Sequence, residues 1–239
     1  MTQGIHPLAA SMVNQLNRVD VISNNLANAN TVGFKGGNIA EGSFNHYLQS
    51  TVEDDKIPDK ESVVMNTIPK IDSSFVNEEV GSIVQTGNQL DFALKDRNMF
   101  FKVEGSNSNV ELTRDGTFKV VDGYLVTQNG YKVLDIDNNP IEAQGDDFVS
   151  SIAVVKTKFS NLDRVGNNNF KAKNMDSVSS VVNNTDYMLQ GAIEKSNVNT
   201  IKSMVDLIEA QRSFEQAQKA ITGIDTINQK LIDTIGTNR

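Results

Sequence analysis

Side chains that could hold a metal ion occur in one acidic run near the middle of the chain. Asp135, Asp137, Asn139 and Asp146 occupy positions one, three, five and twelve of the pattern found in helix-flanked calcium loops. That loop needs glycine at position six for its sharp turn, and this chain has Pro140 there. Helical sequence flanks neither side of the run. We therefore interpret it as an acidic hairpin loop, not as a metal site.

Other common chemistries lack their residues. The chain has no cysteine, which excludes thiol catalysis, disulfides and cysteine-ligated metals. Its two histidines, His6 and His46, have no ligand partner at metal spacing. The glycines within residues 33–37 match no phosphate-binding loop. The sequence thus predicts a protein that is not an enzyme and that uses no cofactor or metal.

Charge and hydropathy exclude further classes. The formal net charge is -8 and the pI is about 4.8, whereas a nucleic-acid binder needs a basic face. No apolar run approaches the roughly 20 residues that cross a bilayer, so membrane insertion is not expected. The first basic side chain is Arg18, and no cleavable signal peptide is recognisable. We expect a cytosolic protein or one that is exported without a cleaved signal.

Both ends of the chain have helical periodicity, and these helices would position any binding surface. Near the N-terminus, apolar residues recur every three or four positions, and Asn28, Asn30 and Gly33 then favour the end of the helix. The spacing predicts one apolar stripe on an otherwise polar helix. Its members are Ile5, Leu8, Met12, Leu16, Val19, Ile22 and Leu26.

The C-terminal segment has a heptad pattern over about four repeats, which is typical of a coiled coil. A helix over 198–235 would be about 55 Å long, and Ser196 and Asn197 are suitable N-cap residues. Asn228 occupies a seam position, where a polar residue fixes the register. Two series of seven-residue spacing form this seam: Leu207, Phe214, Ile221, Asn228 and Ile235, and Ala210, Ala217, Ile224 and Leu231.

Between the ends, short β-branched and aromatic runs alternate with turn residues. Asp122–Gly123 and Asn129–Gly130 are strong hairpin signals. The expected strands are Gly81–Gln85, Phe100–Val103, Thr117–Val121, Tyr124–Thr127, Tyr131–Ile136 and Ile152–Val155.

The fold class that we expect is α+β: a discontinuous helical coiled-coil domain formed by both termini, with an inserted mainly-β domain. Residues 1–34 and 196–239 would form the terminal helical assembly domain. Residues 71–182 would form the β-rich domain, and residues 35–70 and 183–195 would connect the two. An ordinary hairpin of helices within one chain would also explain the seam, but it explains neither the apolar stripes at both ends of the chain nor the many amide side chains of the C-terminal helix.

Four stretches resemble the flagellar rod and hook protein family. NNLANANTVGFK (24–35) resembles its N-terminal signature, and QGAIEKSNVNTIKSMVDLIEAQRSFEQAQKAI (190–221) is similar to its C-terminal signature. Between them, TGNQLDFALKDRNMFFKV (86–103) and LTRDGTFKVVDGYLVTQNGYKVL (112–134) resemble the β-domain core. The order of the motifs is that of the family, and the resemblance covers most of the chain.

The resemblance implies a structural subunit of the flagellar basal body that polymerises helically into the torque-transmitting tube crossing the periplasm. The expected partners are copies of itself, other rod proteins and the type III export machinery, which exports members without a cleaved signal peptide. The length favours a proximal-rod over a distal-rod subunit. The expected assembly interface comprises Leu16, Val19, Ile22, Asn25, Leu26, Asn28, Asn30, Leu207, Ala210, Phe214, Ala217, Ile221, Ile224, Asn228 and Leu231.

Two other classes remain open from the residues alone. A β-domain binding module or adhesin, oligomerised by its helical ends, would retain a ligand on residues 71–182. A cell-wall hydrolase would need an essential carboxylate, and the sequence does not indicate which carboxylate that would be.

Overall fold

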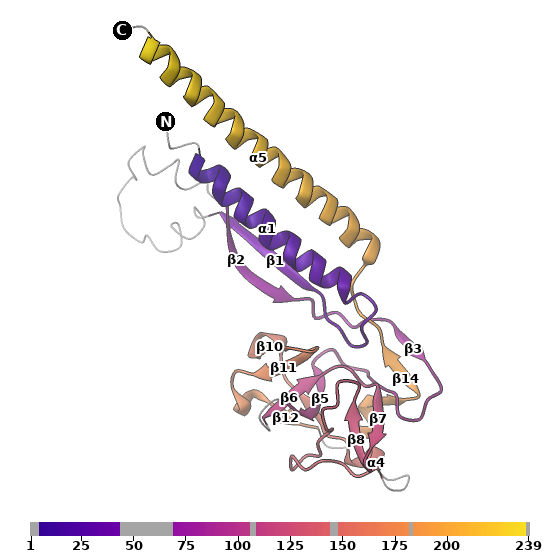
Figure 1. Ribbon diagram of the computed structural model, residues 1–239. Coiled ribbons are helices and arrows are strands. Elements are labelled where there is room, and N and C mark those ends of the chain that lie inside the picture. Colours follow the sequence, from indigo (N-terminus) through magenta and orange to yellow (C-terminus); the bar gives the residue numbers. More distant parts are fainter. Residues whose placement is uncertain (1–4, 44–68, 106–108, 144–147, 182–183, 238–239) are drawn as a thin grey trace. The chain divides into compact units, whose positions relative to one another are not determined.

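The computed structural model describes residues 5–43, 69–105, 109–143, 148–181 and 184–237. These residues form helices near both ends of the chain and a β-rich middle (Figure 1). The chain is therefore an α+β protein. The chain divides into two compact units, one made of 1–26, 37–75 and 200–239 and the other of 27–36 and 76–199.

The first unit contains the two long helices and a two-stranded sheet. Helix α1 spans Ile5–Ala27 and helix α5 spans Thr200–Thr237, and Figure 1 draws them running in opposite directions. Strands β1 (Gly37–Ser43) and β2 (Pro69–Val76) pair with each other. Both strands begin inside the stretch 35–70, which the sequence suggests as a connection.

Helix α5 begins at Thr200 instead of at residue 198, and Asn197 explains the difference. Its side-chain oxygen accepts the Gly36 N–H at 2.8 Å, and its amide nitrogen donates to the carbonyls of Asn77 and Glu79. Because these bonds occupy the side chain, Asn197 does not cap the helix. Its hydrogen bonds instead connect the loop at Gly36 with the loop at residues 77–79.

The second unit is built on a six-stranded sheet in the order β10-β11-β6-β5-β9-β12. Its described residues also form the two-stranded pairs β13-β4, β14-β3 and β7-β8. Short helices lie between the strands. The elements are β3 (Ile83–Gln85), β4 (Phe92–Leu94), β5 (Met99–Glu104), β6 (Val110–Thr113), β7 (Phe118–Val121), β8 (Tyr124–Thr127), α4 (Phe148–Ser151), β9 (Val154–Lys156), η3 (Phe159–Asn161), β10 (Leu162–Gly166), β11 (Asn169–Ala172), η4 (Met175–Ser177), β12 (Ser179–Ser180), η5 (Asn184–Tyr187), β13 (Met188–Gln190) and β14 (Ala192–Glu194).

The central strand β5 is buried on both faces, which is why Met99, Phe100 and Phe101 follow one another as apolar residues instead of alternating with polar ones. Met99 and Phe101 enter one hydrophobic cluster, while Phe100 enters another. Successive side chains of a strand point to opposite faces, so the sheet has a core on each side. Around Phe100, the rings of Phe159 and Phe170 pack edge to face, with centroids 5.0 and 5.9 Å away.

The predicted hairpin at Asp122–Gly123 is confirmed. Both residues have positive φ, 53° and 83°, and join β7 to β8 with Val121 opposite Tyr124. Two positive φ angles define the turn that matches the twist of paired strands. The expected strand Tyr131–Ile136 is wrong in detail, because this stretch forms only isolated bridges such as Val103 with Val133.

The stretch 183–195 also differs from the expected connection. It contains β13, which pairs with β4, and β14, which pairs with β3. Strands of three residues give too little periodicity to be recognised in a sequence.

Candidate assembly surfaces and a buried junction

The heptad seam of α5 is the covered side of that helix. Ala210 and Ala217 are buried, and Leu207, Phe214, Ile221, Ile224 and Asn228 are half-buried, whereas Leu231 is exposed. Most other described side chains of α5 are exposed. Seven-residue spacing keeps these side chains on one face, because two helical turns take about seven residues. The geometry therefore brings the predicted seam together as one face.

The predicted face of α1 is only partly covered. Ile22 and Asn25 are buried, and Val19 and Leu26 are half-buried, but Leu16 is 47% exposed. Asn25 bonds twice to Gly37: its amide donates to the Gly37 carbonyl at 2.7 Å and its oxygen accepts the Gly37 N–H at 2.8 Å. Asn25 thus fixes the start of β1 against the helix.

The two asparagines beyond α1 lie in the turn that ends it. The Asn28 carbonyl accepts the N–H of Thr31 at 3.1 Å, and its side chain accepts the Thr31 hydroxyl at 3.2 Å. Asn30 is exposed. Asn28 therefore has a local turn function in this structure, and a contact of Asn28 or Asn30 with a neighbour stays a prediction.

A charged cluster that no sequence pattern predicts is buried in the β-rich unit. Glu194 on β14 accepts from Lys35 Nζ at 2.7 Å through one carboxylate oxygen, and from Arg114 Nε at 2.8 Å and Nη2 at 2.5 Å through the other. The side chains are 0–1% exposed. We call these three residues the junction. Each lies in one of the four stretches that resemble the family signatures.

The hydrogen-bonding groups of the junction are paired with other groups of the same chain. Arg114 also donates to the carbonyls of Asp96, Arg97 and Met99, which wrap around its guanidinium. Glu194 accepts in addition the N–H of Gly81 at 2.8 Å. A buried ion pair is tolerated only when its remaining donors and acceptors are paired in this way.

Burial lowers the pKa of Lys35 below its ordinary value, and the neighbouring Arg114 lowers it further. Glu194 opposes both effects by its charge and its hydrogen bond. The cluster holds two cations and one carboxylate, so its net charge is positive while Lys35 is protonated. Lys35 Nζ also donates to the Glu79 carbonyl at 2.6 Å, and this bond stabilises the charged form.

The loop before Lys35 is held by further long-range contacts. The guanidinium of Arg164 lies 5.1 Å from the ring centre of Phe34, and Arg164 donates to the carbonyl of Lys35. Gly33 has a φ of 67°, and its N–H donates to the Glu194 carbonyl at 2.7 Å. The stretch 27–36 is therefore part of the β-rich unit, although it follows directly on α1.

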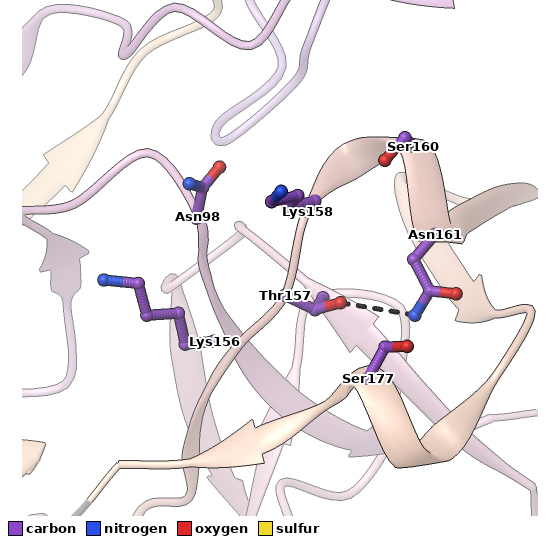
Figure 2. Close-up of a pocket in the computed structure, with 7 residues that line it drawn as sticks. All are labelled: Asn98, Lys156, Thr157, Lys158, Ser160, Asn161 and Ser177. Carbon is purple, nitrogen blue, oxygen red and sulfur yellow. Dashed lines mark hydrogen bonds between the residues drawn. The ribbon is translucent and has the colours of Figure 1, made fainter.

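One surface depression has the polar lining that a ligand site needs. It has a volume of about 450 Å³ and is lined by Asn98, Lys156, Thr157, Lys158, Ser160, Asn161 and Ser177 (Figure 2). Three of these side chains already have partners: Lys156 pairs with Asp96 at 3.0 Å, and Asn161 donates to Thr157 at 3.4 Å. The lining brings together no paired carboxylates, no histidine and no thiol.

The acidic run forms a turn in which Asp135 caps its own loop. Its carboxylate accepts the N–H of Asn139 at 2.8 Å, and its N–H donates to the Asn139 carbonyl. Asp146 and His46 lie outside the described residues. Within the described part of the chain, no group of three possible metal ligands occurs and no helix is long and apolar enough to cross a membrane.

Comparison with known protein families gives three matches in the same order as the motifs. Residues 10–35 match the flagella basal body rod protein family, residues 97–158 the D1 domain of the flagellar hook protein FlgE/F/G family, and residues 189–234 the C-terminal domain of the FlgEFG basal body rod proteins. Lys35, Arg114 and Glu194 each fall within a different one of these matches.

Three relatives extend over nearly the whole chain. The flagellar basal-body rod protein FlgG of Agrobacterium fabrum is 30% identical over 91% of this chain and 93% of its own length. The rod protein FlgF of Rhizobium meliloti is 29% identical over all of both chains, and the hook-basal body complex protein FlhO of Bacillus subtilis is 27% identical over 99% of both.

Helical ends, a β-rich middle and three family matches in the same order define a protein of the flagellar rod and hook class. The chain belongs to the flagellar basal-body rod protein family. It is a structural subunit of the bacterial flagellum.

Proposed function

We propose that this chain is a proximal-rod subunit that polymerises helically, with other rod proteins as its axial neighbours, into the tube that transmits torque. The single observation that carries the proposal is the exposure of apolar side chains along both terminal helices. Ile201, Met204 and Ile232 on α5 are 75%, 51% and 69% exposed. Exposed apolar side chains grouped in this way mark a surface on which another chain packs.

The seam of α5 would pair as a coiled coil with the covered face of α1, in a terminal domain that comprises 1–34 and 196–239. The half-buried Asn228 at a seam position supports this, because an asparagine there fixes register at some cost in stability. Residues 71–182 would form the β-rich domain, with 35–70 and 183–195 as connections. The expected export route is the flagellar type III apparatus, without a cleaved signal peptide.

The choice of proximal over distal rod rests on length. The chain has 239 residues, and the stretch between the first helix and the β-rich domain is short for a distal-rod subunit. A labelled copy, imaged in isolated basal bodies, should lie at the membrane end of the rod. A label at the hook end would assign the chain to the distal rod.

The substitution Ile221→Asp tests assembly through the seam. It places a charge on the half-buried face of α5, and we expect loss of swimming with unchanged export. Thr222→Asp is the matched control, because Thr222 is exposed on the same helical turn. Export is measured as the amount of chain outside the inner membrane. Normal swimming of the Ile221→Asp strain would refute the seam as an assembly surface.

A further inference from the structure

The surface depression in Figure 2 gathers hydrogen-bond donors that the chain itself does not use. Lys158 is exposed, and its ammonium group has no ion-pair or hydrogen-bond partner among the described residues. The hydroxyls of Ser160 and Ser177 also have none in that part of the chain. These groups come from the segment after β9, from η3 and from η4, and they line one depression of about 450 Å³. Three segments thus offer free donors to a single ligand.

Hydrogen bonds between the segments hold the walls of this depression in place. The Thr157 N–H donates to the Asn98 carbonyl at 2.9 Å, which ties the segment after β9 to the residue before β5. The side chain of Asn161 donates to the Asn174 carbonyl at 2.9 Å and accepts the Asn174 N–H at 3.2 Å, which ties η3 to the N-cap of η4. Because these bonds fix the walls before a ligand arrives, binding costs less conformational entropy.

The depression has an excess of positive charge on a chain that is negative overall. Its lining contains two lysines and no carboxylate. Asp96, outside the lining, neutralises Lys156 at 3.0 Å, so the charge of Lys158 remains without a counter-charge among the described residues. The formal net charge of the whole chain is -8, which makes this excess a local feature. A ligand with one negative charge balances it.

The lining also contains a buried acceptor that is unpaired. The side-chain oxygen of Asn98 is buried without a hydrogen-bond partner among the described residues. A buried polar atom without a partner is destabilising. Rotation about the last side-chain bond of an asparagine is soft, so the amide can turn its oxygen toward a donor in the depression. A ligand that carries a hydroxyl group beside its anionic group supplies such a donor.

We propose that this depression binds a small carboxylate that also carries hydroxyl groups, which is the chemistry of a sugar acid. The carboxylate accepts from Lys158 and from the hydroxyls of Ser160 and Ser177, and a ligand hydroxyl donates to Asn98. A carboxylate matches the single excess charge, whereas a phosphate monoester carries about 1.5 to 2 negative charges at neutral pH. The inference does not depend on the proposed function, because every residue that it uses lies in the β-rich unit.

Titration of the isotope-labelled, full-length chain with sodium D-glucuronate tests the assignment. The amide resonances are followed by NMR at constant ionic strength. We expect shifts that saturate and that are largest at Asn98, at residues 157–161 and at Ser177. D-Glucose has the same ring and most of the same hydroxyls but no carboxylate. It should bind about tenfold more weakly, because it offers no charged acceptor to Lys158.

The substitution Lys158→Gln removes the free charge and keeps most of the length of the side chain. We expect about tenfold weaker binding of D-glucuronate, because the carboxylate loses its charged donor. The urea midpoint should not change, since Lys158 is exposed. Lys171→Gln is the matched control. Lys171 is an exposed lysine on β11 of the same sheet and lies outside the lining, so this variant should bind as the unmodified chain does.

Each other outcome overturns the assignment. Shifts that never saturate would show that D-glucuronate has no site on the chain. Equal binding of D-glucose would show that the carboxylate is not recognised. Equal weakening by Lys158→Gln and Lys171→Gln would show a general attraction of anions to exposed lysines. Inorganic phosphate that displaces D-glucuronate at equal concentration would show an unselective anion site. All of these outcomes leave the proposed function intact.

Discussion

Lys35 and Glu194 are 159 residues apart in the chain, yet Lys35 Nζ lies 2.7 Å from Glu194 Oε1 and both side chains are 1% exposed. The pair joins the loop that follows α1 to the strand β14 that precedes α5. Arg114 completes the cluster from the centre of the β-rich unit. The Glu194 carboxylate thus links the stretch after α1 and the strand before α5 to the centre of the β-rich unit.

Glu194→Gln should strongly destabilise the β-rich unit. The change leaves Lys35 and Arg114 buried without a counter-charge, which typically costs about 3–5 kcal/mol. The free energy of unfolding of the full chain is measured by urea titration, with a probe of β structure.

The matched control is Asp163→Asn, which removes the ion pair with Lys173. Both partners are at least half exposed, so the expected change is about 0–1 kcal/mol. If the two variants unfold at the same urea concentration, Glu194 does not stabilise the junction as described.

Gly33→Ala should also destabilise the β-rich unit, for a steric reason. Gly33 has a positive φ, and an added Cβ would overlap the backbone of Arg114 and Asp115. Gly87→Ala is the control, because Gly87 has a φ of 75° but open space around it. The Gly87→Ala variant should be destabilised only by the strain of alanine in a left-handed conformation, about 1–2 kcal/mol. Equal urea midpoints for the two variants would contradict the close approach at Gly33.

Ala210→Leu should destabilise the helical unit, since Ala210 is 2% exposed. Extra methylenes in a packed site typically cost about 1–3 kcal/mol. Thermal unfolding followed by helical circular dichroism should give a lower midpoint. Ala220→Leu on the same helix is exposed and should leave the midpoint almost unchanged. A higher midpoint for Ala210→Leu would show that the seam has unfilled space.

Asp115→Asn should change the pH dependence of stability. Burial raises the pKa of Asp115, although hydrogen bonds from Thr117 oppose the shift. A carboxyl with a raised pKa in the folded state binds its proton before the unfolded state does. Its stabilising contribution is therefore complete below the unfolded pKa of about 3.9 and is lost as the pH rises through the folded pKa.

Unfolding of the Asp115→Asn variant and the unmodified chain is compared from pH 3.5 to neutrality, a range of roughly 3 pH units around the expected titration. The stability of the unmodified chain relative to the variant should fall as the pH rises. A constant difference across this range would mean that Asp115 titrates at its ordinary pKa in the folded chain.

The sequence by itself determined the local elements. Seven-residue spacing marked the side of α5 that is covered, because helical geometry alone places Ala210 and Ala217 on one face. The dipeptide Asp122–Gly123 predicted its hairpin, because few other residues accept two positive φ angles in succession.

Only the tertiary structure decided which distant residues meet. No spacing links Lys35 to Arg114 and Glu194, because the pairing depends on how β14 and the loop before β1 are placed around the core. The exposure of Val13 and Leu16 could not be predicted from the sequence either, because a periodic pattern shows that a helix has an apolar side but not what covers it. Packing of the rest of the chain decides that.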